Sequence, residues 1–133
     1  MHDIVLKNIA VGEVRSDIYI DGDMISRIAK TGSEACPEAR ETVDCTGKAA
    51  MPGFINMHTH AAMSLLRGVG EDIAFHEWLA KVWEIEANLD EEFVYWGTKV
   101  ACLEMIKTGT TTFNDHYWFP LVGHRAAVEM GIR

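Results

Sequence analysis

The feature that most constrains the fold is a change of period near residue 51, after which strand-like and helix-like segments alternate. Residues 49–56 form an apolar run of strand length, and residues 110–113 form a second, β-branched run that reads TTTF. Two segments with helical spacing lie between these runs, and a third helix is expected from Pro120 to about Met130. Strands that alternate with helices form parallel βα units with right-handed crossovers. The sequence therefore predicts an α/β fold in this part of the chain.

The two helices between the strands are predicted from their apolar stripes. The first is expected to bury Trp78, Val82, Ile85 and Leu89, and the second is expected to bury Phe93, Trp96, Val100 and Leu103. In the second helix, Asp90 is predicted to cap the N-terminus, and Gly109 is predicted to take a left-handed conformation after the C-terminus. The tryptophans at helical spacing, Trp78, Trp83 and Trp96, are predicted to lie in the core rather than to stack on a cofactor.

Residues 3–50 are predicted to be rich in β-structure instead. Their β-branched residues nearly alternate, and the sequence DGD at 21–23 predicts a hairpin turn. The polar segment 30–41, which contains Pro37, is predicted to be a surface loop. We expect two parts, residues 1–51 and residues 52–133.

The charge and the cysteines restrict the classes of partner and compartment. The net charge is -8, from 12 basic and 20 acidic residues without a basic cluster, which argues against nucleic acid and against an anionic membrane surface. The three cysteines, Cys36, Cys45 and Cys102, form no C-x-x-C pair, and their odd number suits a reducing compartment. The N-terminus lacks the pattern of a signal peptide, and no apolar window has the length of a membrane span. A cytoplasmic protein is therefore expected.

Two histidines separated by one threonine follow the first predicted strand. Because side chains alternate along a strand, His58 and His60 are expected to face the same way at its carboxyl end. The carboxyl edge of a parallel sheet is where α/β folds bind ligands, and imidazoles are good ligands for zinc. Asn56, two residues earlier, is expected to help orient one ring. Two histidines alone do not make a metal site, so chance placement at a polar strand end stays open.

A longer ordered set of motifs resembles the amidohydrolase superfamily. The set comprises VDCTGKAAMPGFIN, HTH, LLRG, EDI, EWL and ACLEMIKTGTTTFND, in that order. The similarity is greatest to the branch of S-adenosylhomocysteine/5′-methylthioadenosine deaminases and triazine chlorohydrolases. The resemblance implies the N-terminal portion of a (β/α)₈ barrel, TIM-like, in which residues 52–133 supply the first βα units. Residues 1–51 then correspond to part of a small β-sandwich.

The resemblance also implies a metal-dependent reaction. In the superfamily the H-x-H motif binds the catalytic metal, so His58 and His60 are implied to bind one divalent ion, zinc, with iron or manganese as alternatives. The metal lowers the pKa of a bound water, and the resulting hydroxide attacks a ring carbon that bears an amino group. Deaminases of this branch use a glutamate after the first strand to contact the ribose hydroxyls of the substrate. Glu86 is the matching position here, although an exposed helical carboxylate is its structural alternative.

Two residues near the end of the second strand are further candidates for the substrate pocket. His116 shares a strand face with Thr112 and Asn114, and Trp118 lies beside the end of the strand. A loop position satisfied by water is the alternative for His116. Arg67 is expected to form a structural ion pair with Glu71 or Asp72, although substrate contact is open to it as well.

The sequence contains no later strands that would complete such a site. A full barrel needs about 250 residues, so no catalytic acid or base is assigned within this chain, and the isolated chain is expected to be inactive. Three alternatives remain open for the function: a chlorohydrolase, a guanine or cytosine deaminase, or a non-catalytic assembly module. The expected partners are a small heterocyclic substrate and either the missing barrel strands or a complementing chain, and a homo-oligomer is also open.

Overall fold

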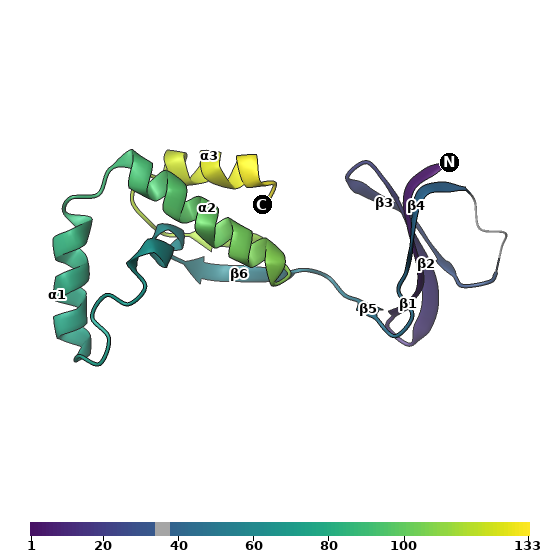
Figure 1. Cartoon of the computed structure of the whole chain (residues 1–133), viewed down its shortest axis with the longest axis horizontal. Coiled ribbons are helices and arrows are strands. Elements are labelled where there is room, and N and C mark those ends of the chain that lie inside the picture. The colour runs from purple at the N-terminus through teal and green to yellow at the C-terminus, as the bar shows by residue number, and fades with distance from the viewer. Residues whose placement is uncertain (34–37) are drawn as a thin grey trace. The chain divides into compact units, whose positions relative to one another are not determined.

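The computed structural model describes residues 1–33 and 38–133, which divide into two compact units, Met1–Pro52 and Gly53–Arg133 (Figure 1). The first unit is a sheet whose strands are β1 (His2–Val11), β2 (Val14–Asp21), β3 (Met24–Lys30), β4 (Ala39–Asp44) and β5 (Ala49–Ala50). The order is β3-β2-β1-β4, and β5 also pairs with β1. The first three strands are antiparallel neighbours, whereas β4 and β5 run parallel to β1.

The β-rich character predicted for residues 3–50 is confirmed, and the turn between β2 and β3 lies within the predicted DGD sequence. Ile9, Ile18 and Cys45 form the buried centre of this unit. The predicted surface loop at 30–41 was partly wrong, because β4 begins at Ala39 and pairs with β1. The part of that loop at residues 34–37, which includes Cys36 and Pro37, lies outside the described residues.

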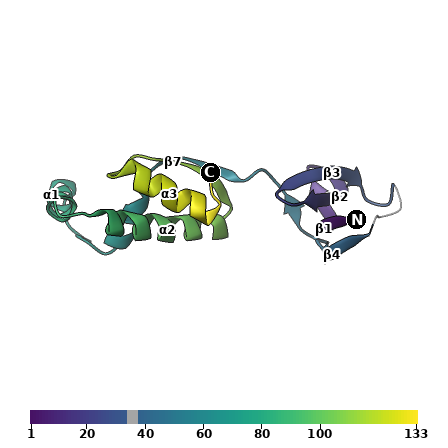
Figure 2. The ribbon, with the colours of Figure 1, turned by 90° about the horizontal axis from the view of Figure 1, so that it is seen from above.

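The second unit alternates strands and helices as predicted. Its elements are β6 (Phe54–Thr59), the 3-10 helix η1 (Ala61–Leu66), α1 (Phe75–Glu86), α2 (Glu91–Lys107), β7 (Thr110–Asp115) and α3 (Pro120–Met130). β6 and β7 are parallel neighbours, which confirms the predicted βα arrangement. Figures 1 and 2 show α2 and α3 side by side, with α1 set apart from both.

The ends of α2 follow the predicted capping chemistry. The side chain of Asp90 accepts a hydrogen bond from the backbone N–H of Phe93, with a donor–acceptor distance of 2.8 Å. Lys107 occupies the last turn, where a positive charge complements the helix dipole. Gly109 has a φ of 89°, the left-handed conformation that glycine adopts without a steric cost.

The predicted buried stripe of α2 was wrong apart from Phe93, which is half-buried and packs against a core cluster. Trp96 and Leu103 are 53% and 51% exposed, and Val100 is also exposed. The buried face consists instead of Val94, Gly97, Thr98, Ala101 and Cys102. These residues are small, and a Cβ at Gly97 would lie only 2.6 Å from the carbonyl oxygen of Ala62 in η1. Close approach of η1 therefore selects the small-residue face of α2, which a search for large apolar residues overlooks.

The stripe of α1 was only partly correct. Val82 is buried, Trp78 and Ile85 are half-buried, and Leu89 lies beyond the end of the helix at Glu86. Trp83 is 60% exposed, so its assignment to the core, like that of Trp96, was wrong. The side chain of Trp83 instead lines an open cavity beside α1.

The expected buried strand at 49–56 was also wrong. Two strands, β5 and β6, occupy this region, and the Pro52-Gly53 pair separates them. Proline lacks the N–H that a strand ladder needs, which accounts for the interruption. Phe54, Ile55 and Met57 of β6 are exposed, because β7 is the one strand that pairs with β6 within the described residues.

Among the described residues, no helix combines the length and the apolar character needed to cross a membrane.

Candidate metal and substrate site

The two histidines of the H-x-H motif lie together where β6 ends. β6 ends at Thr59, and His60 is the first residue of the connection into η1. The ring centroids of His58 and His60 are 4.9 Å apart, and the two rings meet edge to face at 84°. The ring of His116, which follows β7, has its centroid 6.0 Å from that of His60. The carboxyl ends of two parallel strands therefore bring three imidazoles to one edge of the sheet.

The orientation of the His60 ring is fixed by a hydrogen bond. Nδ1 of His60 donates a hydrogen bond to the backbone carbonyl oxygen of His116, and the two atoms are 2.5 Å apart. A carbonyl oxygen can only accept, so the neutral ring carries its proton on Nδ1. The lone pair of Nε2 is then free for a metal ion, an arrangement that is common among metal-binding histidines.

Further polar contacts tie the ends of the two strands to each other and to η1. The carboxylate of Asp115 accepts a hydrogen bond from the backbone N–H of Ala61 at 2.9 Å. The backbone N–H of His116 donates to the carbonyl oxygen of Thr59 at 3.0 Å. These bonds hold the backbone on either side of His60. The sequence analysis did not identify Asp115 in this role, because a contact between positions 54 residues apart leaves no local signal.

Asn56 does not orient an imidazole as expected. Its side-chain oxygen accepts a hydrogen bond from the backbone N–H of His58 at 3.2 Å. On the neighbouring strand, Asn114 donates from Nδ2 to the carbonyl oxygen of Met57 at 3.2 Å. Both amides therefore support the backbone of β6 rather than the ring of either histidine.

A cavity of about 510 Å³ lies beside the histidines. It brings together the predicted metal ligand His60 and the three predicted substrate residues, Glu86, His116 and Trp118. The remaining lining is mainly apolar and aromatic and consists of Met63, Phe75, Trp78, Leu79, Val82, Trp83 and Tyr117. His58 does not line this cavity. Aromatic walls with a few polar groups are typical of sites for small planar ligands.

Tyr117 is a polar group in this cavity that the sequence analysis overlooked. Its hydroxyl is buried and lies beside the carboxylate of Glu86. Burial raises the pKa of the Tyr117 phenol, and the neighbouring carboxylate of Glu86 raises this pKa further. Tyr117 also packs against the cluster of Ala62, Val94 and Val122, so its position is set by the core of the unit.

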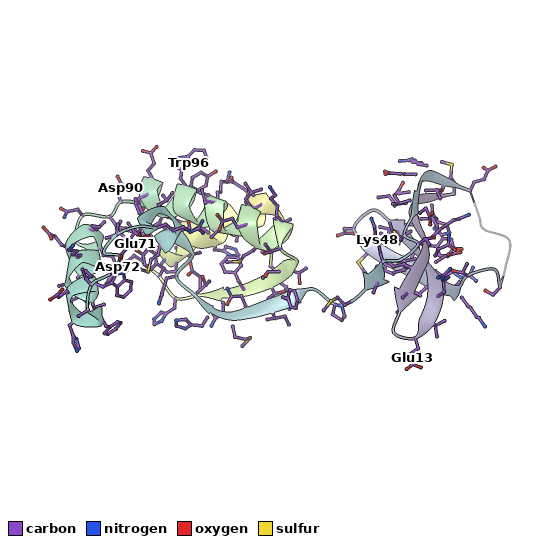
Figure 3. All side chains as sticks on the ribbon, turned by 60° about the horizontal axis from the view of Figure 1, so that its bottom comes forward. Glu13, Lys48, Glu71, Asp72, Asp90 and Trp96 are labelled. Atoms are coloured by element: carbon purple, nitrogen blue, oxygen red, sulfur yellow. The ribbon has the colours of Figure 1, made fainter. Side chains whose placement is uncertain are left out.

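Arg67 forms a structural ion pair, but the expected partners were wrong. Its Nη1 donates to Oε1 of Glu104 in α2 at 2.7 Å, and its Nη2 donates to Oε2 of the same carboxylate. This contact raises the pKa of Arg67 and lowers that of Glu104. Glu71 and Asp72, labelled in Figure 3, make no ion pair within the part of the chain that the structure describes.

The residues at this site fit part of a metal centre. Two imidazoles with adjacent rings, one of them held in the tautomer that leaves Nε2 free, suit a divalent ion such as zinc. Among the described residues, no group of three His, Cys, Asp or Glu side chains is placed to hold a metal ion. The chain therefore provides a pair of candidate ligands and not a complete coordination shell.

Comparison with known proteins identifies the family. The sequence profile of the Amidohydrolase family matches residues 49–133, the segment that carries both histidines and the cavity. The chain belongs to the amidohydrolase family. This amidohydrolase chain is 47% identical to the 5′-deoxyadenosine deaminase of Methanocaldococcus jannaschii over 131 residues, which are 98% of the chain and 31% of that enzyme. It is also 47% identical to 5-methylthioadenosine/S-adenosylhomocysteine deaminase 1 of Archaeoglobus fulgidus, over 98% of the chain and 31% of that enzyme.

Solved structures confirm the fold expected for this amidohydrolase chain. An adenosine deaminase from Xanthomonas campestris with bound zinc superimposes with a TM-score of 0.86 at 30% identity, over 99% of the chain and 33% of that protein. An atrazine chlorohydrolase from Arthrobacter aurescens superimposes with a TM-score of 0.76 at 24% identity, over 98% of the chain and 34% of that protein. These neighbours are barrel enzymes of the amidohydrolase family. The chain spans about a third of the length of the relatives that it matches.

Proposed function

We propose that this chain supplies part of the active site of a metal-dependent aminohydrolase that deaminates an adenosine derivative. The observation that carries the proposal is the pair of imidazoles, 4.9 Å apart at the carboxyl end of β6, beside a cavity that contains Glu86. Relatives at 47% identity are named as deaminases of 5′-deoxyadenosine and of 5-methylthioadenosine/S-adenosylhomocysteine. The reaction replaces an amino group on the purine ring by oxygen from water and releases ammonia.

His58 and His60 are the proposed metal ligands, and zinc is the proposed ion, with iron or manganese as alternatives. Imidazole nitrogen suits zinc, and the solved adenosine deaminase that resembles this chain contains zinc. When bound, zinc supplies a Lewis acid that makes water a nucleophile at neutral pH. His60 binds through Nε2, because its Nδ1 is committed to the carbonyl oxygen of His116.

The cavity beside the histidines is the proposed substrate site. Its aromatic residues provide flat apolar walls against which a purine ring can stack, and they exclude water from that ring. The carboxylate of Glu86 is proposed to accept hydrogen bonds from the ribose hydroxyls of the substrate. His116 and Trp118 are proposed to line the purine end of the cavity, on the side of β7.

The general acid and base are not assigned to residues of this chain. Because the described residues hold no third metal ligand close to His58 and His60, the remaining ligands are proposed to come from further barrel strands or from a complementing chain. We therefore expect the 133-residue chain by itself to release no ammonia from these substrates.

A chlorohydrolase is the second candidate, supported by the superposition with the atrazine chlorohydrolase. That likeness is at 24% identity and concerns the fold alone. The deaminases are twice as similar in sequence over nearly the same residues, so deamination is the better-supported reaction. A guanine or cytosine deaminase and a non-catalytic assembly module have no observation in their favour.

We also place the protein in the cytoplasm. Cys45 and Cys102 are buried free thiols, which a reducing compartment preserves.

A chimeric enzyme tests the proposed function. In this chimera, the chain replaces the segment of the Methanocaldococcus jannaschii deaminase that aligns with it. The release of ammonia and the release of chloride are both measured, with 5′-deoxyadenosine, 5′-methylthioadenosine and a chlorinated triazine as substrates. We expect deamination of an adenosine derivative and no release of chloride. Glu86→Gln should raise the KM for the nucleoside by roughly ten-fold or more, since a charged hydrogen-bond partner is lost. A folded, zinc-loaded chimera that releases chloride but no ammonia would overturn the proposal.

A further inference from the structure

The solvent-facing side of α2 carries an apolar row that the other described elements of the second unit leave uncovered. Trp96, Val100 and Leu103 are all exposed, and they recur at spacings of four and three, so they lie on one face of the helix. Figure 3 shows Trp96 on the outside of α2. Single exposed apolar side chains are common, but a contiguous row of large ones marks an interaction surface.

The same face ends in two opposite charges. Glu92 lies four residues before Trp96, and Lys107 lies four residues after Leu103. Both side chains are exposed, and neither makes an ion pair within the described part of the chain. We call Glu92, Trp96, Val100, Leu103 and Lys107 together the α2 row.

The α2 row is complementary to itself when it is reversed. Glu92 and Lys107 are equally distant from a point between Lys99 and Val100, and Trp96 and Leu103 are equally distant from that same point. If a second α2 lies antiparallel across a two-fold axis at that point, Glu92 faces Lys107 of the partner subunit. Trp96 then faces Leu103 of the partner subunit. A two-fold interface uses one patch twice, so each of these contacts occurs twice.

The side chain nearest the axis does not oppose this pairing. Lys99 stands beside the axis, and two copies of a free lysine there would repel each other. Its Nζ lies 2.7 Å from Oε2 of Glu129 on α3 of the same chain, and it also lies over the rings of Tyr95 and Trp96. The charge of Lys99 is therefore balanced within each copy.

We propose that the chain self-associates through α2, as an antiparallel pair of helices related by a two-fold axis between Lys99 and Val100. The occupant is a second copy of this chain, because the order of acidic, apolar and basic side chains along the α2 row matches its own reverse. The α2 row lies away from the histidine cavity, whose lining includes no residue of α2. The proposal is independent of the proposed function.

A charge-exchange cycle tests the proposal on the intact chain. Sedimentation velocity over a range of protein concentrations gives the dimer dissociation constant for the wild type and for Glu92→Lys, Lys107→Glu and the double variant. Each single exchange places like charges opposite one another at both ends of the pair, and we expect it to weaken the dimer roughly ten-fold. The double variant restores opposite charges and should return the constant to within about three-fold of the wild type. Trp96→Ala should weaken the dimer by ten-fold or more, since large aromatic anchors dominate such interfaces.

Leu121→Ala is the matched control. Leu121 is 82% exposed on α3 and lies outside the α2 row, so its truncation should leave the dissociation constant unchanged. Circular dichroism confirms that each variant is folded. A wild-type chain that stays monomeric at all concentrations contradicts the proposal. So does a dimer that tolerates both single exchanges, or a double variant as weak as the singles, because either result places the contact elsewhere.

Discussion

Nδ1 of His60 donates a hydrogen bond to the backbone carbonyl oxygen of His116, across the ends of two parallel strands. The bond joins positions 56 residues apart in sequence and decides which nitrogen of the His60 ring carries the proton. The backbone N–H of Ala61 also donates to Asp115, and that of His116 donates to Thr59. Together these three hydrogen bonds join the carboxyl ends of β6 and β7.

The first prediction concerns the tautomer of His60. In the metal-free chain at a pH where the ring is neutral, the proton should reside on Nδ1, because the carbonyl oxygen of His116 holds it there. Nitrogen-15 NMR correlation spectra of the histidine rings distinguish the two tautomers. His124, exposed on α3, serves as the reference, because its ring makes no such bond among the described residues. A proton found on Nε2 of His60 would contradict the proposed mode of metal ligation.

The second prediction concerns the close packing of α2 against η1. In Gly97→Ala the new Cβ would lie 2.6 Å from the carbonyl oxygen of Ala62, and backbone atoms must shift to admit it. We expect the free energy of unfolding to fall by about 1–3 kcal/mol, the usual cost of overpacking. Urea denaturation followed by circular dichroism gives the value.

Gly123→Ala is the matched control for this substitution. Gly123 is a buried helical glycine on α3, and a Cβ there would make ordinary contacts of 3.6 Å with Asp115 and 3.7 Å with Thr98. Helix propensity favours alanine by up to about 1 kcal/mol, so this variant should be as stable as the wild type or more stable. Equal effects of the two substitutions would show that the approach of η1 does not select the small face of α2.

The third prediction concerns the ion pair between Arg67 and Glu104. The hydrogen bonds from Arg67 lower the pKa of Glu104 below its ordinary value of 4.5. A carboxyl whose pKa is lower in the folded state stabilises the fold above its unfolded pKa, and this contribution is lost as pH falls through the folded pKa. The difference in unfolding free energy between the wild type and Glu104→Gln should therefore be constant at neutral pH and should shrink below about pH 4.5.

Chemical denaturation at a series of pH values measures this difference. Glu84→Gln is the control, because Glu84 is an exposed glutamate on α1 that makes no ion pair among the described residues. A stability difference for Glu104→Gln that stays constant down to the acid transition would show that the ion pair contributes nothing.

Local chemistry allowed much of the second unit to be predicted from the sequence. The alternation of strands and helices, the Asp90 cap and the left-handed Gly109 depend on residues close together in the chain. The pairing of the His58 and His60 rings follows from the period of a strand in the same way. Trp118 was a candidate because it lies beside the end of the second strand, whereas Glu86 was identified only by the resemblance to a known family, because no spacing relates α1 to the end of β7.

The errors have a common physical cause. The buried face of α2, the partner of Arg67 and the role of Asn56 all depend on which distant backbone approaches them. Apolar periodicity predicts that a helix has a buried face, but it favours large side chains. The close approach of η1 to Gly97 reverses that preference. Exposure of Trp96 was for this reason not foreseeable from the sequence of α2 alone.

The central claim is that His58 and His60 bind the catalytic metal, and the metal content of the purified chimera tests it most directly. Elemental analysis by mass spectrometry should find about one zinc ion per chain in the unmodified chimera and in the control His124→Ala, because His124 lies on α3 and does not line the cavity beside His60. His58→Ala, His60→Ala and the double variant should retain well under a tenth of that zinc, since each removes a ligand from one coordination shell. A folded double variant that keeps its full zinc content would contradict the claim.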